Sequence, residues 1–244
     1  MNNKIIGIIP ARYNSSRFLG KLLFKIGSKT LLQHTYENAK KCHILDDLII
    51  ATEDEIIFQE AQKFNAKCVM TNKSANGTER IIDVLKNNKE IQSSSIIINL
   101  QGDHPRIDKK TIEETINILK NDTDAKVSTA VTRINYEEAK SPNTVKCVFD
   151  NNQNALYFSR SLIPFAKNEK DISYYYHIGI YAYKTSFLFD LEKMPQTSLQ
   201  KSEDLEQLKI MEHGYKIKVA IVDDAPVGVD VFEDVKKVEK ILCQ

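Results

Sequence analysis

The sequence predicts an α/β fold with a mostly parallel central sheet. Through the first hundred residues, short apolar runs rich in β-branched side chains alternate with segments of helical periodicity. This alternation is typical of parallel strands joined by right-handed crossover helices. With 244 residues, the chain is long enough for one large α/β domain. Two of the apolar runs are followed by charged residues, and the carboxyl ends of parallel strands are where such sheets bind ligands.

The first half of the chain has the clearest alternation. In order, we expect a strand at Lys4–Ile9, a helix at Thr30–Lys41, a strand at Leu48–Ala51, a helix at Ile56–Phe64, a strand at Lys67–Met70, a helix at Gly77–Leu85 and a strand at Ser95–Leu100. The first strand is a short run rich in β-branched residues, which predicts burial on both faces. The last strand of this half leads directly to Asp103.

After about Lys126 the pattern changes to strands separated by turns. We expect strands at Val127–Arg133, Val145–Asp150, Ala155–Ser159, Tyr174–Tyr183 and Ile217–Val222, with helices at Glu203–His213 and Val231–Leu242. The clearest turn signal is Asn151-Asn152. The chain has no internal repeat and no low-complexity linker, so residues 1–244 are predicted to form a single domain with a small excursion.

Composition excludes several classes of protein. Lys plus Arg number 34 against 33 Asp plus Glu, a net charge of +1, which argues against non-specific binding of nucleic acid. No stretch is apolar enough to span a bilayer, and the N-terminal segment lacks the pattern of a signal peptide, so we expect a cytoplasmic protein without a membrane partner. The four cysteines are scattered, which is typical of buried free thiols in a reducing compartment.

The loop after the first strand carries three cations, Arg12, Arg17 and Lys21. It matches neither the phosphate loop G-x-x-x-x-G-K-[ST] nor the dinucleotide motif G-x-G-x-x-G, because its glycine comes late, at Gly20. Charged side chains and backbone N–H groups of such a loop can still surround a triphosphate. A solvated basic loop without a ligand would have the same composition, so the loop alone leaves both interpretations open.

Two aspartates follow the strands and could hold a metal ion. Asp103 comes after Gln101-Gly102, and a carboxylate at a strand end is a natural ligand for Mg²⁺. The alternative is an ordinary Asp in a tight turn before Pro105. Asp230 could also bind metal, but with Glu233 it fits a helix-capping box. The two roles are compatible if only one carboxylate oxygen of Asp230 serves the cap.

Two further segments are candidates for ligand contacts. Asn76-Gly77-Thr78-Glu79-Arg80 opens a predicted helix, whose free N–H groups could hold an anion or the edge of a base. His177 precedes Ile178-Gly179-Ile180-Tyr181 on a strand that we expect to line the crevice. No pair of histidines has the spacing of a zinc site.

Taken in order, seven segments across essentially the whole chain resemble the 3-deoxy-manno-octulosonate cytidylyltransferases, also called CMP-Kdo synthetases. The segments are Ile9–Tyr13 with Ser16-Arg17 and Gly20-Lys21, Asn76–Arg80, Gln101–Asp103, Ala155–Ser161 with Ile163-Pro164, His177–Tyr181, Glu203–Leu208, and Val229-Asp230 with Glu233-Asp234.

This resemblance implies a Rossmann-like nucleotidyltransferase fold and a cytoplasmic homodimer, with a dimerisation excursion at roughly residues 134–185. It implies an enzyme of lipopolysaccharide biosynthesis that couples CTP to the acidic sugar Kdo and releases diphosphate, with Mg²⁺ as cofactor. Catalysis is assigned to Lys21, Asp103 and Asp230, and the metal to the two aspartates. The nucleotide is assigned to Pro10, Ala11, Arg12, Arg17, Lys21, Asn76, Gly77, Arg80 and Gln101. The sugar is assigned to Gln101, Arg160, His177, Tyr181, Glu206 and Gln207.

The chemistry of the substrates agrees with these roles. The attacking hydroxyl and the α-phosphate develop negative charge, so cations and a metal ion should supply most of the acceleration. Kdo carries a carboxylate, which a guanidinium such as that of Arg160 can bind through two parallel hydrogen bonds.

The sequence departs from the family pattern at a few places. His104 stands where the family usually has Glu, Phe18–Leu22 lacks the two prolines of the first loop, and Val231-Phe232 replaces the usual Thr-Pro. His104 is expected beside the acceptor, so a relative that acts on 8-amino-Kdo stays possible.

Three other functions are alternatives to Kdo activation. They are a CMP-sugar synthetase for a nonulosonic acid such as sialic acid, a metal-dependent glycosyltransferase, and a nucleotide sensor without catalysis. The Tyr157–Ser161 and Glu203–Leu208 segments favour Kdo over the first. Asp103-His104-Pro105 lacks the Asp-x-Asp motif of the glycosyltransferases, and the retained aspartates argue against lost catalysis.

Overall fold

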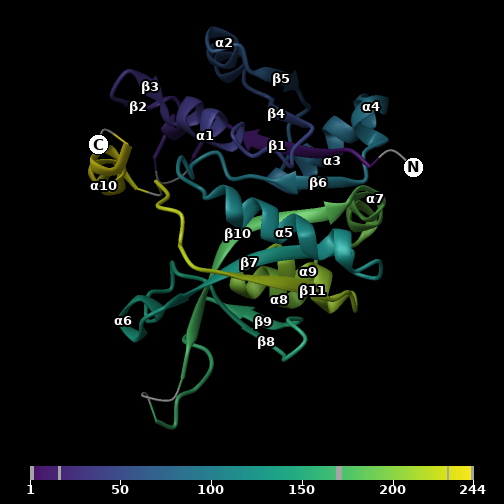
Figure 1. Ribbon diagram of the computed structural model, residues 1–244, viewed down its shortest axis with the longest axis vertical. Coiled ribbons are helices and arrows are strands. Elements are labelled where there is room, and N and C mark those ends of the chain that lie inside the picture. Colours follow the sequence, from purple (N-terminus) through teal and green to yellow (C-terminus); the bar gives the residue numbers. More distant parts are fainter. Residues whose placement is uncertain (1–2, 16–17, 169–171, 230, 243–244) are drawn as a thin grey trace. The chain divides into compact units, whose positions relative to one another are not determined.

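The computed structural model describes residues 3–15, 18–168, 172–229 and 231–242 (Figure 1). Contacts within the chain define two compact units. Unit 1 comprises Met1–Ile112 with Pro226–Gln244, and unit 2 comprises Glu113–Ala225. The expectation of a single domain with a dimerisation excursion at roughly residues 134–185 stays a prediction.

Unit 1 contains a sheet whose strands are all parallel. Its strands are β1 (Ile5–Ala11), β4 (Asp47–Thr52), β5 (Lys67–Met70) and β6 (Ile96–Asn99), in the order β6-β1-β4-β5. The register of β1 runs from Ile6 opposite Asp47 to Ala11 opposite Thr52, and on its other side Ile8 lies opposite Asn99. The isoleucine side chains of β1 and β6 are buried, as expected of central strands covered on both faces. This confirms the parallel pairing predicted from the sequence.

The helices of unit 1 follow the predicted crossovers. They are α1 (Leu31–Ala39), α2 (Glu55–Lys63), α3 (Gly77–Asn87), the short α4 (Lys89–Gln92) and α10 (Phe232–Leu242). The segment between β1 and α1 also contains the 3₁₀ helix η1 (Lys21–Leu23) and a small hairpin of β2 (Lys25–Ile26) and β3 (Lys29–Thr30). The helices α1 and α3 begin where a side chain accepts an N–H of the first turn. Thr30 accepts from Gln33 and Asn76 from Glu79.

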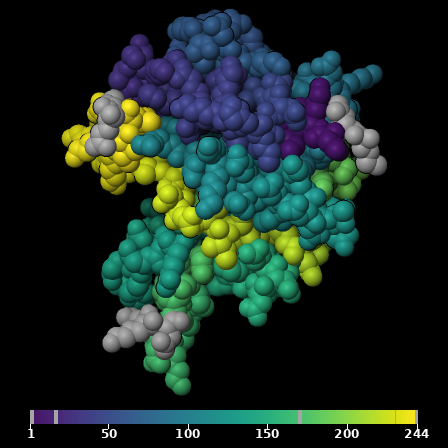
Figure 2. Space-filling model, in the orientation of Figure 1, coloured from purple at the N-terminus to yellow at the C-terminus, as the bar shows by residue number. Residues whose placement is uncertain are grey.

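The predicted capping box of Asp230 and Glu233 stays a prediction, because Asp230 lies outside the described residues. The helix α10 begins at Phe232. At its start, the Asp234 carboxylate accepts the N–H of Val231 at 3.2 Å. Figure 2 shows α10, in yellow, on the surface of unit 1 near the purple-blue β2–β3 hairpin.

Unit 2 is built on a mixed sheet. Its strands are β7 (Val127–Ile134), β8 (Lys146–Phe149), β9 (Ala155–Ser159), β10 (Tyr174–Lys184) and β11 (Ile217–Val222). Strand β7 pairs in parallel with β11 and antiparallel with β10, while β8 pairs antiparallel with both β10 and β9. The predicted change after Lys126, from alternating strands and helices to strands joined by turns, is thus confirmed.

The sequence prediction is wrong about one helix of unit 2. We expected a continuous helix at Glu203–His213, but the structure has α8 (Ser198–Glu203) and α9 (Gln207–Glu212) separated by a turn. Asp204 adopts a left-handed conformation there, with φ of 51°. The carbonyl groups of Glu203 and Asp204 accept hydrogen bonds from the Arg160 guanidinium, which satisfies the acceptors that the helix end leaves open.

Several helices have no counterpart among the predicted elements. The longest are α5 (Lys109–Asn121) and α7 (Thr185–Lys193), and the short α6 (Tyr136–Ala139) also belongs to this group. In α5, Ile112, Ile116 and Leu119 are buried at the spacing of one helix face. Over the described part of the chain, no helix combines the length and apolarity needed to cross a bilayer.

Candidate functional site

The first loop and the end of β6 meet in unit 1. Lys21 opens η1, and its Nζ donates to Asp103 Oδ2 at 2.5 Å. Asp103 follows β6, and Gly102 before it is held by the Thr35 hydroxyl, which donates to its carbonyl at 2.8 Å. Because β1 and β6 are parallel neighbours, the segments that follow them leave the same edge of the sheet. The structure therefore brings together Lys21 and Asp103, two residues predicted to act in catalysis.

The Asp103 carboxylate is held in its ionised form. Burial raises the pKa of Asp103, but the charges of His104 and Lys21 and the hydrogen bond from Lys21 lower it, and the net pKa is below the usual value. The side chain is nevertheless 22% exposed, so an incoming ligand can reach it. An ionised, reachable carboxylate with a cation beside it is suited to a metal ion that travels with phosphates.

The loop that carries the cations is closed by backbone contacts. Gly20 N–H donates to the Tyr13 carbonyl at 3.0 Å, and Tyr13 N–H donates to Asp54 Oδ2 at 2.6 Å. Gly20 has a φ of +69°, and a Cβ on it would lie 3.1 Å from the Tyr13 ring, so this position favours glycine. Arg12 is exposed at the entrance of the loop. Arg17 lies outside the described residues, so its predicted contact with the triphosphate stays a prediction.

The start of α3 lies against the end of β1. A Cβ on Gly77 would be 3.3 Å from Pro10 Cγ, so glycine allows the helix to approach the strand closely. Asn76 accepts the Glu79 N–H at 2.9 Å. Arg80, in contrast, is buried and engaged within unit 1, as its guanidinium pairs with Glu53 at 3.2 Å and donates to the Thr71 hydroxyl at 3.1 Å. Its charge is therefore balanced within the protein.

Asn99, at the end of β6, was not singled out in the sequence. It is 1% exposed, and its Oδ1 makes no hydrogen bond within the described structure. The amide lies close to the start of α3, with Nδ2 3.8 Å from the Cβ position of Gly77. A buried acceptor without a partner is costly in a folded protein. The signal available in the sequence was a polar residue at the end of the run Ile96–Ile98.

In unit 2, Arg160 is tied to the protein backbone. Its Nε donates to the Glu203 carbonyl at 2.8 Å, and its terminal nitrogens donate to the carbonyls of Pro142 and Asp204, each at 3.3 Å. The side chain is 38% exposed, so part of the guanidinium also faces solvent. Arg160 can therefore present the remaining N–H groups to an anion while its orientation is fixed by these three carbonyls.

His177 lies in a buried aromatic layer of unit 2. Its ring contacts those of Phe158 and Tyr181, with centroid distances of 4.8 and 5.3 Å. The Thr129 hydroxyl donates to the Ile180 carbonyl at 2.6 Å, so it must accept from His177 Nε2–H at 2.9 Å. This network assigns the tautomer in which Nδ1 is the unprotonated acceptor. Burial lowers the pKa of His177 to about 3, which makes the ring neutral at physiological pH.

The other residues predicted for the sugar also belong to unit 2, except Gln101. Tyr181 is buried, and burial, together with the neighbouring Tyr183 and Glu206, raises its pKa, so it stays a neutral hydroxyl. Gln207 begins α9 and is 3% exposed, and its Nε2 makes no hydrogen bond within the described structure. A buried amide donor without a protein partner is suited to a polar ligand.

His104, expected beside the acceptor sugar, packs within unit 1. A Cβ on Gly228 would lie 2.8 Å from its Cδ2 atom, so the ring lies directly against that glycine. The adjacent Val229 N–H donates to the Asp103 carbonyl at 3.1 Å. The His104 side chain is only 13% exposed. The expected position of His104 beside the acceptor sugar stays a prediction.

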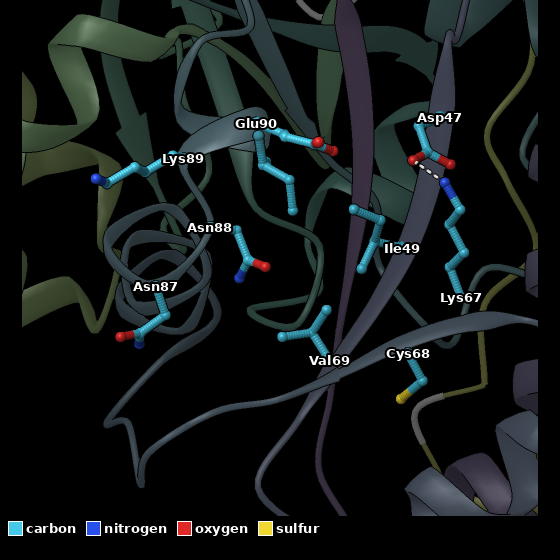
Figure 3. A pocket seen from close by; sticks show the side chains of 10 residues that line it. Asp47, Ile49, Lys67, Cys68, Val69, Asn87, Asn88, Lys89 and Glu90 are labelled. Carbon is cyan, nitrogen blue, oxygen red and sulfur yellow. Dashed lines mark hydrogen bonds and ion pairs between the residues drawn. The ribbon is translucent and has the colours of Figure 1, made fainter.

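Unit 1 also has a groove that none of the predicted site residues lines (Figure 3). It has a volume of about 450 Å³ and lies between β4, β5 and the segment that joins α3 to α4. Figure 3 shows Lys67 pointing toward Asp47, and their Nζ and Oδ2 atoms are 2.5 Å apart. The lining carries two cations, Lys67 and Lys89, and two carboxylates, Asp47 and Glu90, so the groove lacks the unbalanced positive charge that a triphosphate would need.

Comparison with known proteins agrees with this geometry. The family model described as cytidylyltransferase matches residues 6–217. The 3-deoxy-manno-octulosonate cytidylyltransferase of Protochlamydia amoebophila is 50% identical over 249 residues, which is 100% of this chain and 96% of the relative. The mitochondrial enzyme of the same name from Arabidopsis thaliana is 43% identical over 98% of this chain and 83% of its own length. This chain belongs to the 3-deoxy-manno-octulosonate cytidylyltransferase family.

A solved structure adds the fold to this family assignment. CMP:2-keto-3-deoxy-manno-octonic acid synthetase, determined as a complex with CTP, is 36% identical, with a TM-score of 0.93 over 99% of both chains. The predicted α/β nucleotidyltransferase fold with a mostly parallel sheet is thus confirmed. As a member of this family, the chain is a CTP-dependent cytidylyltransferase, which confirms the resemblance drawn from the seven segments.

The buried state of His177 predicts how stability depends on pH. The unfolded chain binds a proton at His177 below pH about 6.5, whereas the folded protein does so only near its lowered pKa of about 3. Stability should therefore fall as the pH decreases from 6.5 toward 3, by up to about 1.4 kcal/mol per pH unit from this residue. Urea unfolding from pH 7 to 4.5 should give a steeper loss for the wild type than for His177→Gln. Equal slopes would contradict the buried neutral imidazole.

Proposed function

We propose that this protein activates Kdo with CTP, forming CMP-Kdo and diphosphate for lipopolysaccharide biosynthesis. The observation that carries the proposal is the Lys21–Asp103 contact at the carboxyl edge of a parallel sheet, in a chain that matches a CTP-bound synthetase along its whole length. The proposal includes a homodimer located in the cytoplasm.

The reaction demands control of negative charge. As the anomeric hydroxyl of the sugar attacks the α-phosphorus, a new oxygen–phosphorus bond forms and the hydroxyl loses its proton. The bond from the α-phosphorus to the oxygen that bridges to the β-phosphate breaks, and diphosphate leaves with that oxygen. Lys21 Nζ is held by Asp103 within unit 1, so this cation is oriented before any phosphate arrives. Arg12 is exposed at the same loop and can contact the outer phosphates. Pre-positioned cations stabilise the transition state because they need no rearrangement as charge develops.

Mg²⁺ is the cofactor that these residues fit. The donors are carboxylate oxygens, which this hard cation prefers, and phosphate oxygens and water usually complete its coordination. Asp103 is ionised and reachable, and Asp230 follows Val229, whose N–H is bonded to the Asp103 carbonyl. Asp103 and Asp230 would hold the ion. When bound, Mg²⁺ supplies positive charge to the α-phosphate.

The sugar is proposed to contact residues of unit 2. The exposed part of Arg160 is suited to the Kdo carboxylate, while His177 Nδ1 can accept a hydrogen bond from a sugar hydroxyl. Gln207 Nε2 offers a buried donor that the described structure leaves without a partner. Glu206 and Tyr181 are the remaining sugar contacts that the resemblance implies in this unit.

The proposal is tested by a diphosphate-release assay that crosses CTP, UTP and ATP with Kdo, 8-amino-Kdo and sialic acid. We expect the highest kcat/KM for CTP with Kdo. A preference for 8-amino-Kdo or sialic acid would identify a related CMP-sugar synthetase and overturn the assignment of Kdo. If no diphosphate is released with any of the three acid sugars, the proposed reaction is overturned altogether. Diphosphate release that does not depend on an added acid sugar would overturn it as well.

The first variant tests the carboxylate beside Lys21. Asp103→Asn has nearly the same shape, so the fold should persist, but the charge that orients Lys21 and is proposed to bind Mg²⁺ is lost. We expect kcat to fall by about 10²-fold or more. Steady-state kinetics at saturating Mg²⁺, with a thermal melt as the control for folding, make the measurement. Near-normal turnover with an unchanged melt would remove Asp103 from catalysis.

The second variant separates capping from metal binding at Asp230. Ser is also a good N-cap, so Asp230→Ser should be as stable as the wild type. If the carboxylate holds Mg²⁺, the same variant should be nearly inactive at any Mg²⁺ concentration. Thermal melts and kinetics across a Mg²⁺ titration distinguish the two roles. An active Asp230→Ser protein would return the residue to a purely structural role.

The third variant concerns recognition of the sugar carboxylate. Arg160→Lys keeps the positive charge but loses the planar arrangement of donors and the bonds to the three backbone carbonyls. We expect KM for Kdo to rise by about tenfold or more, with little change in KM for CTP. The two Michaelis constants are measured on the same preparation. A rise in both by the same factor would indicate a general loss of structure instead of a role in sugar binding.

A further inference from the structure

A lysine without exposure to solvent lies in unit 2, and none of the proposed catalytic steps uses it. Lys146 opens β8 and is 0% exposed. Its Nζ donates to the Arg160 carbonyl at 2.6 Å and to the Ser141 carbonyl at 2.9 Å. Burial lowers its pKa, and the charge of Arg160 lowers it further, while Glu203 raises it. Burying a cation costs free energy, so Lys146 must have a role other than keeping the protein surface soluble.

Glu203 also binds the backbone of Arg160, but at its N–H group. Its Oε2 accepts the Arg160 backbone N–H at 2.9 Å, and its Oε1 accepts the Ser159 hydroxyl at 2.6 Å. The Ser159 oxygen in turn accepts the Ser161 N–H at 3.0 Å. The two backbone polar groups of Arg160 are thus each bound by a charged side chain: Lys146 binds the carbonyl, and Glu203 binds the N–H.

The same contacts also determine the turn between α8 and α9. Arg160 donates back to the carbonyls of Glu203 and Asp204, and Asp204 is the left-handed residue that ends α8. Glu206 and Gln207 follow within three residues. A change in the backbone at residue 160 would therefore reach the turn that carries two of the proposed sugar contacts.

We propose that Lys146 and Glu203 are positioning residues for the acid sugar, which together hold the Arg160 backbone and the Asp204–Gln207 turn in the geometry that binds its carboxylate and hydroxyls. Neither residue touches the substrate in this role. The inference rests on the proposed function, because it assigns Arg160 and the turn to the sugar. Charged hydrogen bonds are suited to this task, since they are shorter and stronger than bonds between neutral groups.

A stabilising role alone would predict a different outcome. Lys146→Met removes the donor of two backbone carbonyls, so a purely stabilising role predicts a lower melting temperature with unchanged Michaelis constants. A positioning role predicts instead that the apolar variant binds the sugar poorly even when it remains folded. The two roles therefore separate in the Michaelis constants of the two substrates.

The test uses Lys146→Met and Glu203→Gln in the full-length protein, with Kdo and CTP as substrates. We expect KM for Kdo to rise by about 10- to 100-fold in Lys146→Met, with KM for CTP within about twofold of the wild type. Glu203→Gln keeps one acceptor oxygen but offers an amide where the second accepted a hydrogen bond, so we expect a smaller rise, of about three- to tenfold. The double variant should show a rise smaller than the product of the single effects, because the two residues act on one backbone segment.

Lys184→Met is the matched control. Lys184 is also a lysine of unit 2 whose Nζ donates to a backbone carbonyl, that of Leu119, at 2.6 Å, but it has no bond to Arg160 or Glu203. We expect a thermal shift without a selective change in KM for Kdo. If Lys146→Met does not fold, Glu203→Gln alone decides the matter.

The outcomes distinguish this inference from the proposed function. An active wild type with folded Lys146→Met and Glu203→Gln proteins that keep the wild-type KM for Kdo would overturn the positioning role only. An equal rise in KM for Kdo and KM for CTP in Lys146→Met and Glu203→Gln would also overturn it. So would a rise in KM for Kdo in Lys184→Met as large and as selective as that in Lys146→Met. A wild type that transfers CMP to none of the acid sugars would instead overturn the proposed function, on which the inference rests.

Discussion

The parallel pairing of β1 with β6 is the constraint on which the site in unit 1 depends. Because both strands run in the same direction and lie side by side, the loop after β1 and the turn after β6 leave one edge of the sheet. Lys21 and Asp103 are 82 positions apart in the chain, yet their side chains are joined by an ion pair. The sheet supplies this proximity, and the ion pair then orients the cation.

Charges inside the protein are bound to specific partners. In unit 1, Arg80 pairs with Glu53 and Thr71, so a residue that the family resemblance assigns to the nucleotide is first of all part of the structure. In unit 2, Lys146 and Glu203 bind the backbone of one residue from two sides. Such contacts contribute little net stability compared with apolar packing, but they define one geometry, since each donor has a particular acceptor.

The polar side chains of the candidate sites differ in charge and burial between the two units. In unit 1, the groups are ionised and partly exposed, as Asp103 illustrates, which is suited to phosphates and a divalent cation. In unit 2, His177 and Tyr181 are buried and neutral, so they can recognise hydroxyl groups without introducing a charge. Arg160 is the partly exposed cation among the proposed sugar contacts of unit 2. An acid sugar, with several hydroxyls and one carboxylate, presents the complementary set of groups.

The sequence by itself determined the parallel sheet of unit 1, because strands such as Ile5–Ala11 and Ile96–Asn99 are short, apolar and separated by amphipathic helices. It also determined the family, because its motifs occur in order along the whole chain. Local periodicity could not reveal the break between α8 and α9, since that turn is stabilised by Arg160, more than 40 positions earlier. Nor could it show that Arg80 is bound by Glu53, that His104 lies against Gly228, or that Lys146 is buried. These features depend on contacts between residues distant in the sequence, which arise only once the strands have paired and the chain has packed.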